Sequence, residues 1–496
     1  MAAIITEKFR THNARQFIED FSESNQKNYV FIGRSHAWAD DTSPPPPANS
    51  ESEEIGAFED MIALKAVSST DISHGLVRYN WTTGTKYDEY RDNYSASNTT
   101  NVTGVSNFFD GRGYVITDEF KVYKCLRTGV NSSNAIINST VKPTTVSTTI
   151  PEVTADTGAS LGYMWKFMYS VTASDVIKFV TNDFIPVKTL GAKASVSGSG
   201  TNGGFGTTAT DDGSAQWDVE TASVDGAIFH YTVTAAGSSY TSGSSTTFTV
   251  DVDVQGDGSG AVATLSFVSG VLDQVYHKSG TASWGSGYKR ASLPTIASGI
   301  TGIAGGSGAT VHIHMSPING HGANPIEELG GNYAIVNSRL EFGEGGGDFP
   351  TDNDFRRIGL IKNPVKSDGG TISNLDSMTA TNLLTVDNAG SISVDDLLTD
   401  AASESATTAK IRVVSKTSNT LQTLPVVNSG GEYVAFANND EVFKSGTKVA
   451  TVTNSGVSAL HPEMTRFTGQ ILYVENRGAV SRAADQIEDI KLIIEM

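Results

Sequence analysis

Near its start the chain reads YVFIGRSHAW (residues 29–38), and near its end it reads GQILYVENR (residues 469–477). The first segment opens with an uninterrupted apolar run, which predicts a strand over residues 29–32. The second segment runs through charged residues into a last apolar strand at the end of the chain. Between these two ends the composition changes twice, and the two changes set the expected domain organisation.

The first 190 residues combine the sequence patterns of helices and strands. Ala14, Phe17, Ile18 and Phe21 fall at helical spacing, with Thr11 as the expected N-cap. A second short helix is expected from Ile55, Phe58, Met61 and Ile62.

Strands are expected in the rest of this first part. Residues 114–126 predict a hairpin that turns around Asp118 and Glu119, and the aromatic run at residues 163–169 predicts another strand. The four prolines at residues 44–47 exclude helix and central strand, so an extended surface segment is expected there. A mixed α/β region is therefore predicted.

At about residue 191 the chain becomes rich in Gly, Ser and Thr, and it contains an internal repeat. Residues 237–240 (GSSY) match residues 285–288 (GSGY), and residues 258–261 (GSGA) match residues 306–309 (GSGA), both at a separation of 48 positions. Alternation over residues 248–254 predicts a strand. A repeated strand–turn–strand unit needs its neighbour to cover its apolar face, so an all-β region of two similar halves is expected.

A second change comes near residue 367. Strands separated by polar turns are expected at residues 411–414, 433–436 and 448–452, whereas residues 331–342 and 355–361 read like the first part of the chain. The predicted fold class is α+β, mostly β, with a discontinuous mixed core domain and two β-rich inserted domains. The expected core segments are 1–190, 317–366 and 456–496, and the expected insertions are 191–316 and 367–455.

Chain length, net charge and cysteine content limit the number of domains, the possible partners and the compartment. With 496 residues, about three domains are expected. The net charge of −19 disfavours nucleic acid as a partner, because an acidic surface repels phosphates. Cys125 is the only cysteine, which excludes an intrachain disulfide and is expected to be a buried apolar side chain. Neither a signal peptide nor a membrane-spanning run is expected, so synthesis in a cytoplasm follows.

Candidate metal and ligand sites have plain structural alternatives. Residues 251–258 place carboxylates as a calcium loop would, including Asp251 and Asp253, but the twelfth position is Val262 and a strand with outward carboxylates fits better. His312 and His314 share a strand face, the arrangement of a two-histidine metal site, for which the axis of an oligomer is the expected place; satisfied or exposed strand histidines are the favoured alternative. The GSGTNG stretch at residues 198–203 opens no helix, so it predicts a linker and not a phosphate site.

Several segments, in order, resemble the baseplate wedge subunit of T-even-like contractile-tailed bacteriophages. Besides the two ends, these are KFRT (residues 8–11), GYMWKF (162–167), NDFIPV (182–187), FRRIGLIKNP (355–364) and the tail that runs from residue 475 through ADQ (484–486) to Ile490. The two long insertions depart from the family pattern. The resemblance implies a dimer-forming wedge protein that contacts neighbouring wedge and arm subunits, in the virion's tail baseplate.

This resemblance implies a structural and non-enzymatic role, with no cofactor, metal or catalytic residue. Partners are expected to be a second copy of the chain and other wedge and arm or fibre-connecting subunits, without nucleic acid and without membrane insertion. The expected structural and assembly residues are Phe9, Arg10, Arg34, Trp38, Trp165, Arg356, Glu475, Asn476 and Arg477. Two alternatives stay open: a host-recognition or carbohydrate-binding tail protein, suggested by the repeated β insertion, and a tail-associated glycan hydrolase with two facing carboxyl groups.

Overall fold

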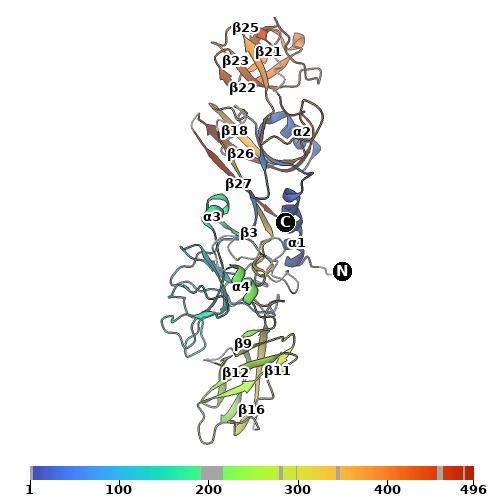
Figure 1. Ribbon diagram of the computed structural model, residues 1–496. Coiled ribbons are helices and arrows are strands. Elements are labelled where there is room, and N and C mark those ends of the chain that lie inside the picture. Colours follow the sequence, from blue (N-terminus) through green and yellow to red (C-terminus); the bar gives the residue numbers. More distant parts are fainter. Residues whose placement is uncertain are drawn as a thin grey trace. The chain divides into compact units, whose positions relative to one another are not determined.

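The computed structural model describes residues 4–190, 216–278, 283–297, 299–341, 347–454, 462–483 and 486–496. Strands make up 42% and helices 11% of the chain, in several sheets and one small barrel, which confirms the predicted mostly β fold class (Figure 1). Within the described residues, none of the helices has the length and apolar character needed to cross a membrane.

The chain divides into two compact units. The first contains Met1–Arg15, His74–Ala334 and Ile494–Met496, and the second contains Gln16–Ser73 and Ile335–Ile493. The chain passes between them inside α1 (Glu7–Glu19), β3 (Ile72–Val77), β17 (Tyr333–Leu340) and β27 (Glu488–Glu495). The division into five segments by residue number stays a prediction.

The first helix starts earlier than the sequence predicts. Thr11 is buried inside α1 and is not its N-cap. Thr6 makes the contact of a cap instead, because its side-chain oxygen accepts the Phe9 backbone N–H at 3.3 Å. The short turn η1 (Asp20–Ser22) follows the helix and buries Phe21.

A sheet with the order β4-β5-β7-β6 carries the aromatic core of the first unit. Its strands are β4 (Tyr114–Ile116), β5 (Lys121–Arg127), β6 (Glu152–Val153) and β7 (Met164–Ser170). Strands β4 and β5 form the predicted hairpin, with Tyr114 opposite Lys124. Cys125 is fully buried in this core beside Tyr163 and Trp165, as expected, and burial raises the pKa of its thiol.

Three short helices and one strand complete this part of the first unit. They are α3 (Ala173–Phe179), β8 (Phe184–Val187), α4 (Gln216–Ala222) and α5 (Pro325–Leu329). Strand β8 pairs with β3, and α3 is capped by Thr172, whose side chain accepts the Asp175 N–H.

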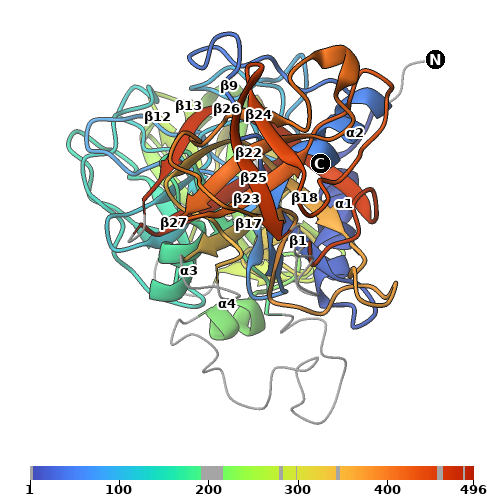
Figure 2. The same ribbon diagram turned by 90° about the horizontal axis from the view of Figure 1, so that it is seen from above.

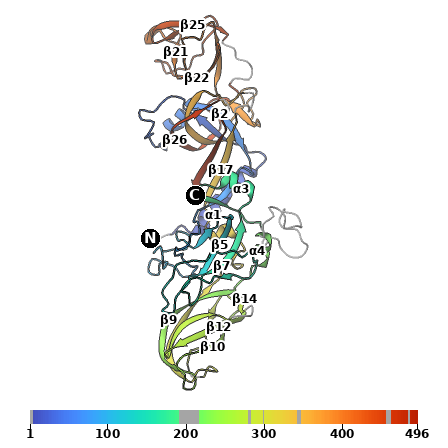
Figure 3. The same cartoon turned by 90° about the vertical axis from the view of Figure 1, so that its left-hand side faces the viewer.

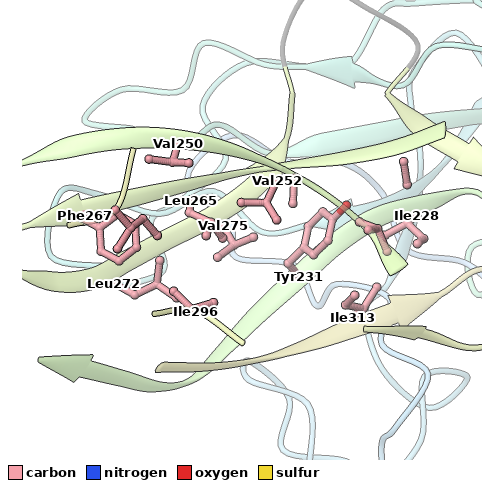
Figure 4. Close-up of a cluster of buried hydrophobic side chains, with 14 of the residues drawn as sticks. Ile228, Tyr231, Val250, Val252, Leu265, Phe267, Leu272, Val275, Ile296 and Ile313 are labelled. Atoms are coloured by element: carbon pink, nitrogen blue, oxygen red, sulfur yellow. The ribbon is translucent and has the colours of Figure 1, made fainter. Parts of the chain in front are cut away.

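The β-rich segment after residue 216 is built on two long strands, β9 (Ile228–Thr241) and β16 (Gly305–Met315), which pair with each other. A second layer has the order β10-β12-β13, with β14 also paired to β12 (Figure 3). The bounds of the strands outside the long pair are β10 (Phe248–Asp253), β11 (Gln255–Gly256), β12 (Ser259–Val268), β13 (Val271–His277), β14 (Trp284–Ser286) and β15 (Ala291–Ser292). Figure 4 shows side chains such as Val252, Leu265 and Ile313 pointing toward one another between these strands.

The internal repeat of the sequence is also a repeat in three dimensions. Tyr240 accepts the Ala309 N–H through its hydroxyl oxygen at 2.9 Å, and Tyr288 accepts the Ala261 N–H in the same way at 3.4 Å. Ser307 pairs with Ser238, and the residues 48 positions earlier and later, Ser259 and Ser286, also pair. Each copy therefore pairs two antiparallel strands, and a tyrosine hydroxyl accepts a backbone N–H from the paired strand.

The second unit contains a five-stranded sheet with the order β19-β2-β1-β18-β26. The strands are β1 (Asn28–Gly33), β2 (Met61–Val67), β18 (Asn353–Lys362), β19 (Ser377–Thr379) and β26 (Gln470–Arg482). The predicted strand at residues 29–32 is thus central, between β2 and β18. Helix α2 (Glu51–Asp60) ends before Met61, so the prediction that Met61 and Ile62 are helical is wrong: both are buried strand residues.

A closed barrel occupies residues 382–454 of the second unit (Figure 2, orange to red). Its strands, in barrel order, are β20 (Asn382–Val386), β23 (Thr420–Pro425), β22 (Lys410–Thr417), β21 (Leu397–Thr399), β24 (Glu441–Lys444) and β25 (Thr447–Asn454), with the turn η3 (Glu404–Ala406) between β21 and β22. Two predicted strands lie in β22 and β25. The predicted strand at residues 433–436 is wrong, because this segment has no ladder partner and its Val434 and Phe436 instead pack on the barrel core.

Candidate functional site

Strand β1 ends in a kink that aims Arg34 toward the end of α2. The pairing of β1 with β2 shifts register between Ile32 and Gly33, and Arg34 has a φ of 58°. A side chain at Gly33 would place its Cβ 2.9 Å from the Asp60 carbonyl oxygen, so only glycine fits there. The Arg34 N–H donates to the same carbonyl at 2.9 Å. The irregular backbone therefore fixes the direction in which Arg34 leaves the strand.

Trp38 lies at the centre of the candidate site, a cluster of side chains from the loop after β1, from β18 and from β26. The Arg34 guanidinium lies 3.6 Å from the centroid of the Trp38 ring, and that of Arg357 lies at 5.8 Å. On its other side, Trp38 Nε1 donates to the Arg477 carbonyl at 2.8 Å. Trp38 thus connects the first distinctive segment of the sequence with the last one.

Arg356 ties the loop after β1 to the sheet. Its Nε donates to both carboxylate oxygens of Asp41 at 3.0 Å, its second guanidinium nitrogen contacts Asp354 at 3.0 Å, and the remaining nitrogen donates to the Ser35 carbonyl. The side chain is only 6% exposed. Each of the three nitrogens of this buried guanidinium has an acceptor, as a buried charge requires.

Arg357 reaches the other partners of the cluster. Its Nε donates to Asn476 Oδ1 at 2.9 Å, one terminal nitrogen donates to Glu53, and the other lies 3.6 Å from Asp60. Asn476 in turn donates to the Pro45 carbonyl at 3.1 Å. The proline-rich segment is therefore held against β26.

Charge is dense around these side chains. Burial, together with the nearby arginines 34, 412, 356 and 357, lowers the pKa of His36 to about 3. Burial raises the pKa of Asp60, although the charges of Arg357 and Arg34 oppose that rise. The hydrogen bonds from Arg356 and from the Trp38 N–H lower the pKa of Asp41. At neutral pH His36 is thus neutral beside ionised arginines.

A cavity of about 340 Å³ opens beside the cluster, between α2 and the barrel strand β23. Arg34, Arg357 and Arg412 line it together with His36, Glu53 and Asp60. A wall of both charge signs suits a charged or hydrogen-bonding side chain of another protein better than it suits an apolar ligand.

The structure brings five of the nine expected assembly residues together: Arg34, Trp38, Arg356, Asn476 and Arg477. Glu475 is adjacent, with one carboxylate oxygen 3.7 Å from Arg477 Nε and the other accepting from the Tyr473 hydroxyl at 3.0 Å.

Phe9, Arg10 and Trp165 are not part of this cluster. Phe9 is half exposed on α1, and Arg10 pairs with Glu495 at 3.1 Å. Trp165 is fully buried in the aromatic core, stacked on Tyr163 at 5.7 Å, so it can influence assembly only through the fold.

The residues considered for metals lie in the first unit. Asp251 and Asp253 are exposed strand residues, as expected, and Asp251 pairs with Lys278 at 3.0 Å. His312 and His314 both face Asp92, a residue that no local sequence pattern connects with them. Together these three form a group with the geometry to hold a metal ion within the described parts of the chain. Residues 198–203 lie outside the described residues.

Sequence reasoning missed two further residues of the site, Arg357 and Asp60. Arg357 was visible inside the FRRIGLIKNP segment, but nothing local separated its role from that of Arg356. Asp60 offered no signal at all, because it ends an ordinary acidic helix. Their importance comes from contacts between segments about 300 residues apart, such as Arg357 with Asp60.

No sequence among the curated proteins matches the chain. The family model described as "Phage-Gp8: Bacteriophage T4, Gp8" matches residues 3–192. That segment includes Trp38 and the strands β1 and β7, and it is less than half of the chain. Residues 3–192 are therefore similar to that family, and the match does not extend over the rest of the chain.

Proposed function

We propose that this chain is a structural, non-enzymatic subunit of the wedge in the baseplate of a contractile phage tail. It forms a homodimer in the virion and docks neighbouring wedge and arm or fibre-connecting subunits. It is assembled in the host cytoplasm.

The observation that carries this proposal is the way the resembling segments meet. The family model ends at residue 192, yet FRRIGLIKNP and GQILYVENR also resemble the family and lie far beyond that limit. Strand β1 from the matched part pairs with β18, and β18 pairs with β26. The resembling segments thus make neighbouring strands of one sheet, which supports extending the likeness beyond the matched residues.

The cluster around Trp38 combines buried arginines, which hold its shape, with an exposed arginine side chain. Arg356 and Arg357 are buried and fully engaged, so they set geometry. Arg477 uses its backbone carbonyl for Trp38, while its side chain is 46% exposed. A partner subunit would therefore meet the Arg477 side chain on a surface that the buried arginines hold in shape.

The test is assembly from purified components. The full chain is mixed with the wedge and arm proteins of the same phage, and the masses of the complexes are measured. We expect a dimer alone and larger complexes on mixing. Arg477→Ala should keep the unfolding temperature and lose complex formation, whereas Arg339→Ala, which removes a comparably exposed strand arginine, should change neither.

Other outcomes would point to the alternatives. A chain that ignores wedge proteins but binds host glycans would favour host recognition, and glycan turnover would favour a hydrolase. Normal tail assembly with Arg477→Ala would contradict the role given to that residue.

A further inference from the structure

Three side chains converge where the loop around residue 92 meets strand β16. Asp92 Oδ1 lies 2.9 Å from His312 Nε2 and 2.9 Å from His314 Nδ1. The three atoms all lie within 4.8 Å of one another. Two hundred and twenty residues separate Asp92 from His312, so the fold alone creates this group.

We propose that Asp92, His312 and His314 bind a divalent transition-metal ion of the zinc class. Two imidazole nitrogens and one carboxylate oxygen are typical ligands of such ions. His312 and His314 are two positions apart on β16 and thus share one face of the strand. The ligand atoms of a tetrahedral zinc are about 3.3 Å apart. The two Asp92 contacts, at 2.9 Å, need to open by a few tenths of an ångström, and the two imidazole nitrogens lie within 4.8 Å of each other.

The surroundings hold the ligands in place. The Met315 N–H donates to Asp92 Oδ2 at 3.0 Å, which leaves Oδ1 facing both imidazoles. His314 Nε2 lies 2.8 Å from Thr232 Oγ1 on β9. A ligand histidine commonly has its second ring nitrogen fixed by such a contact. The ring of His230 also stacks on His314, with centroids 4.7 Å apart.

The tautomer of His314 decides which hydrogen bonds its two ring nitrogens make with Thr232 and Asp92. When Nε2–H donates to Thr232, the lone pair of Nδ1 faces the carboxylate oxygen, and a cation between them stabilises both. Without a cation, Nδ1–H donates to Asp92, and Thr232 donates to Nε2. The same three residues thus serve both states, with a proton exchanged for the metal.

The site is open enough to load. The side chain of His312 is 37% exposed and that of Asp92 is 24% exposed, while that of His314 is 1% exposed. Water can therefore reach the ion and fill its remaining coordination positions.

A bound ion would act as a clamp. Asp92 belongs to the segment before the β-rich region, and both histidines belong to a long strand of that region. Metal binding would therefore fix the β-rich region to the loop that carries Asp92, within the first unit. This inference does not depend on the baseplate role.

The experiment uses the full chain without a histidine tag, stripped of metals with a chelator. Co²⁺ is titrated in, its visible absorption is recorded, and Zn²⁺ is then added as competitor. We expect one Co²⁺ per chain, displaced by one Zn²⁺, and a higher unfolding temperature with Zn²⁺. His312→Ala and Asp92→Asn should each weaken binding by at least about tenfold, and Thr232→Val by about tenfold with recovery in Thr232→Ser.

Controls separate binding from folding. His12→Ala and Asp253→Asn remove an exposed histidine and an exposed strand aspartate elsewhere, and they should leave Co²⁺ binding unchanged. His312→Ala should unfold at the metal-free wild-type temperature with or without Zn²⁺, because its side chain is 37% exposed and little packing is lost. Absence of saturable binding to the wild type, or equal binding to the Asp92→Asn and His312→Ala variants, would overturn the proposal.

Discussion

Arg356 and Arg357 are neighbours in the sequence, yet they hold different parts of the chain. Arg356 contacts Asp41 and Ser35 in the loop after β1, and Arg357 contacts Asn476 on β26 and Glu53 on α2. Both are buried, so each needs its partners to offset desolvation. Lysine cannot replace either one, because a single ammonium does not reproduce the forked hydrogen bonds of a guanidinium.

Buried histidines make stability depend on pH, and His74 is the clearest case. Burial lowers its pKa from 6.5 to about 4, although its Nδ1–H donates to the Gly331 carbonyl at 2.9 Å. Below pH 6.5 the unfolded chain takes up a proton that the folded chain refuses until about pH 4, so stability falls as the pH is lowered through this window. At pH 5 the loss from this group is about 2 kcal/mol.

The measurement compares urea midpoints at pH 7.5 and pH 5 for the wild type and His74→Gln. The variant should lose about 2 kcal/mol less than the wild type between the two pH values. His12→Gln removes an exposed histidine and should keep the wild-type dependence. Equal pH dependence in wild type and His74→Gln would show that His74 titrates normally.

Strands with strong local patterns were predictable, but their pairing was not. The apolar run at residues 29–32 and the hairpin around Asp118 can each be recognised from consecutive residues alone, and both predictions are confirmed. Residues 433–436 look equally strand-like, yet they pack on the barrel without a ladder partner. The difference depends on barrel closure, which is set by distant strands.

The residues of the candidate site were also only partly predictable from the sequence. The resemblance selected Arg34, Trp38, Arg356, Asn476 and Arg477, which the structure brings together. It did not select Asp60 or Asp92, because Arg357, which contacts Asp60, and His312, which contacts Asp92, lie far away in the sequence. The role of a carboxylate depends on the side chains that pack against it in the fold. In a chain with many acidic residues, the neighbouring sequence does not show which carboxylates have such partners.

The two repeated strand pairs, β9 with β16 and β12 with β14, make a sharp prediction about glycine. Gly237 has a φ of +61°, and a Cβ there would lie 2.5 Å from the Ala309 nitrogen and the Ser307 oxygen. Gly285, 48 positions later, has a φ of +64° and the same clash with Ala261 and Ser259. Gly237→Ala and Gly285→Ala should each lower the free energy of unfolding by about 3 kcal/mol, because overpacking adds to backbone strain.

Gly243 provides the matched control. Its φ is also +61°, but nothing lies within 4 Å of the position of a Cβ. Gly243→Ala should therefore cost only the strain of the left-handed backbone, about 1 kcal/mol. Thermal unfolding of the three variants measures the difference, and a Gly237→Ala cost no larger than that of Gly243→Ala would mean that β16 does not pack tightly against Gly237.

At the scale of the whole molecule, large apolar side chains are exposed at and just before the start of α1. Ile4, Ile5 and Phe9 are 85%, 66% and 53% exposed. Large apolar side chains grouped at one helix end are a common sign of a protein interface. Phe9 also lies in the KFRT segment that resembles a dimer-forming family, so we expect a second copy of the chain to cover this end.

Ile5→Lys combined with Phe9→Lys should convert the dimer into a monomer, because two charges cannot be buried in an apolar contact without partners. Light scattering coupled to size-exclusion chromatography measures the mass. Ile177→Lys is the matched control, since Ile177 is 64% exposed on α3 and should leave the dimer intact. A double variant that stays dimeric and folded would place the dimer contact elsewhere, whereas a wild type that is already monomeric at micromolar concentration would contradict self-association itself.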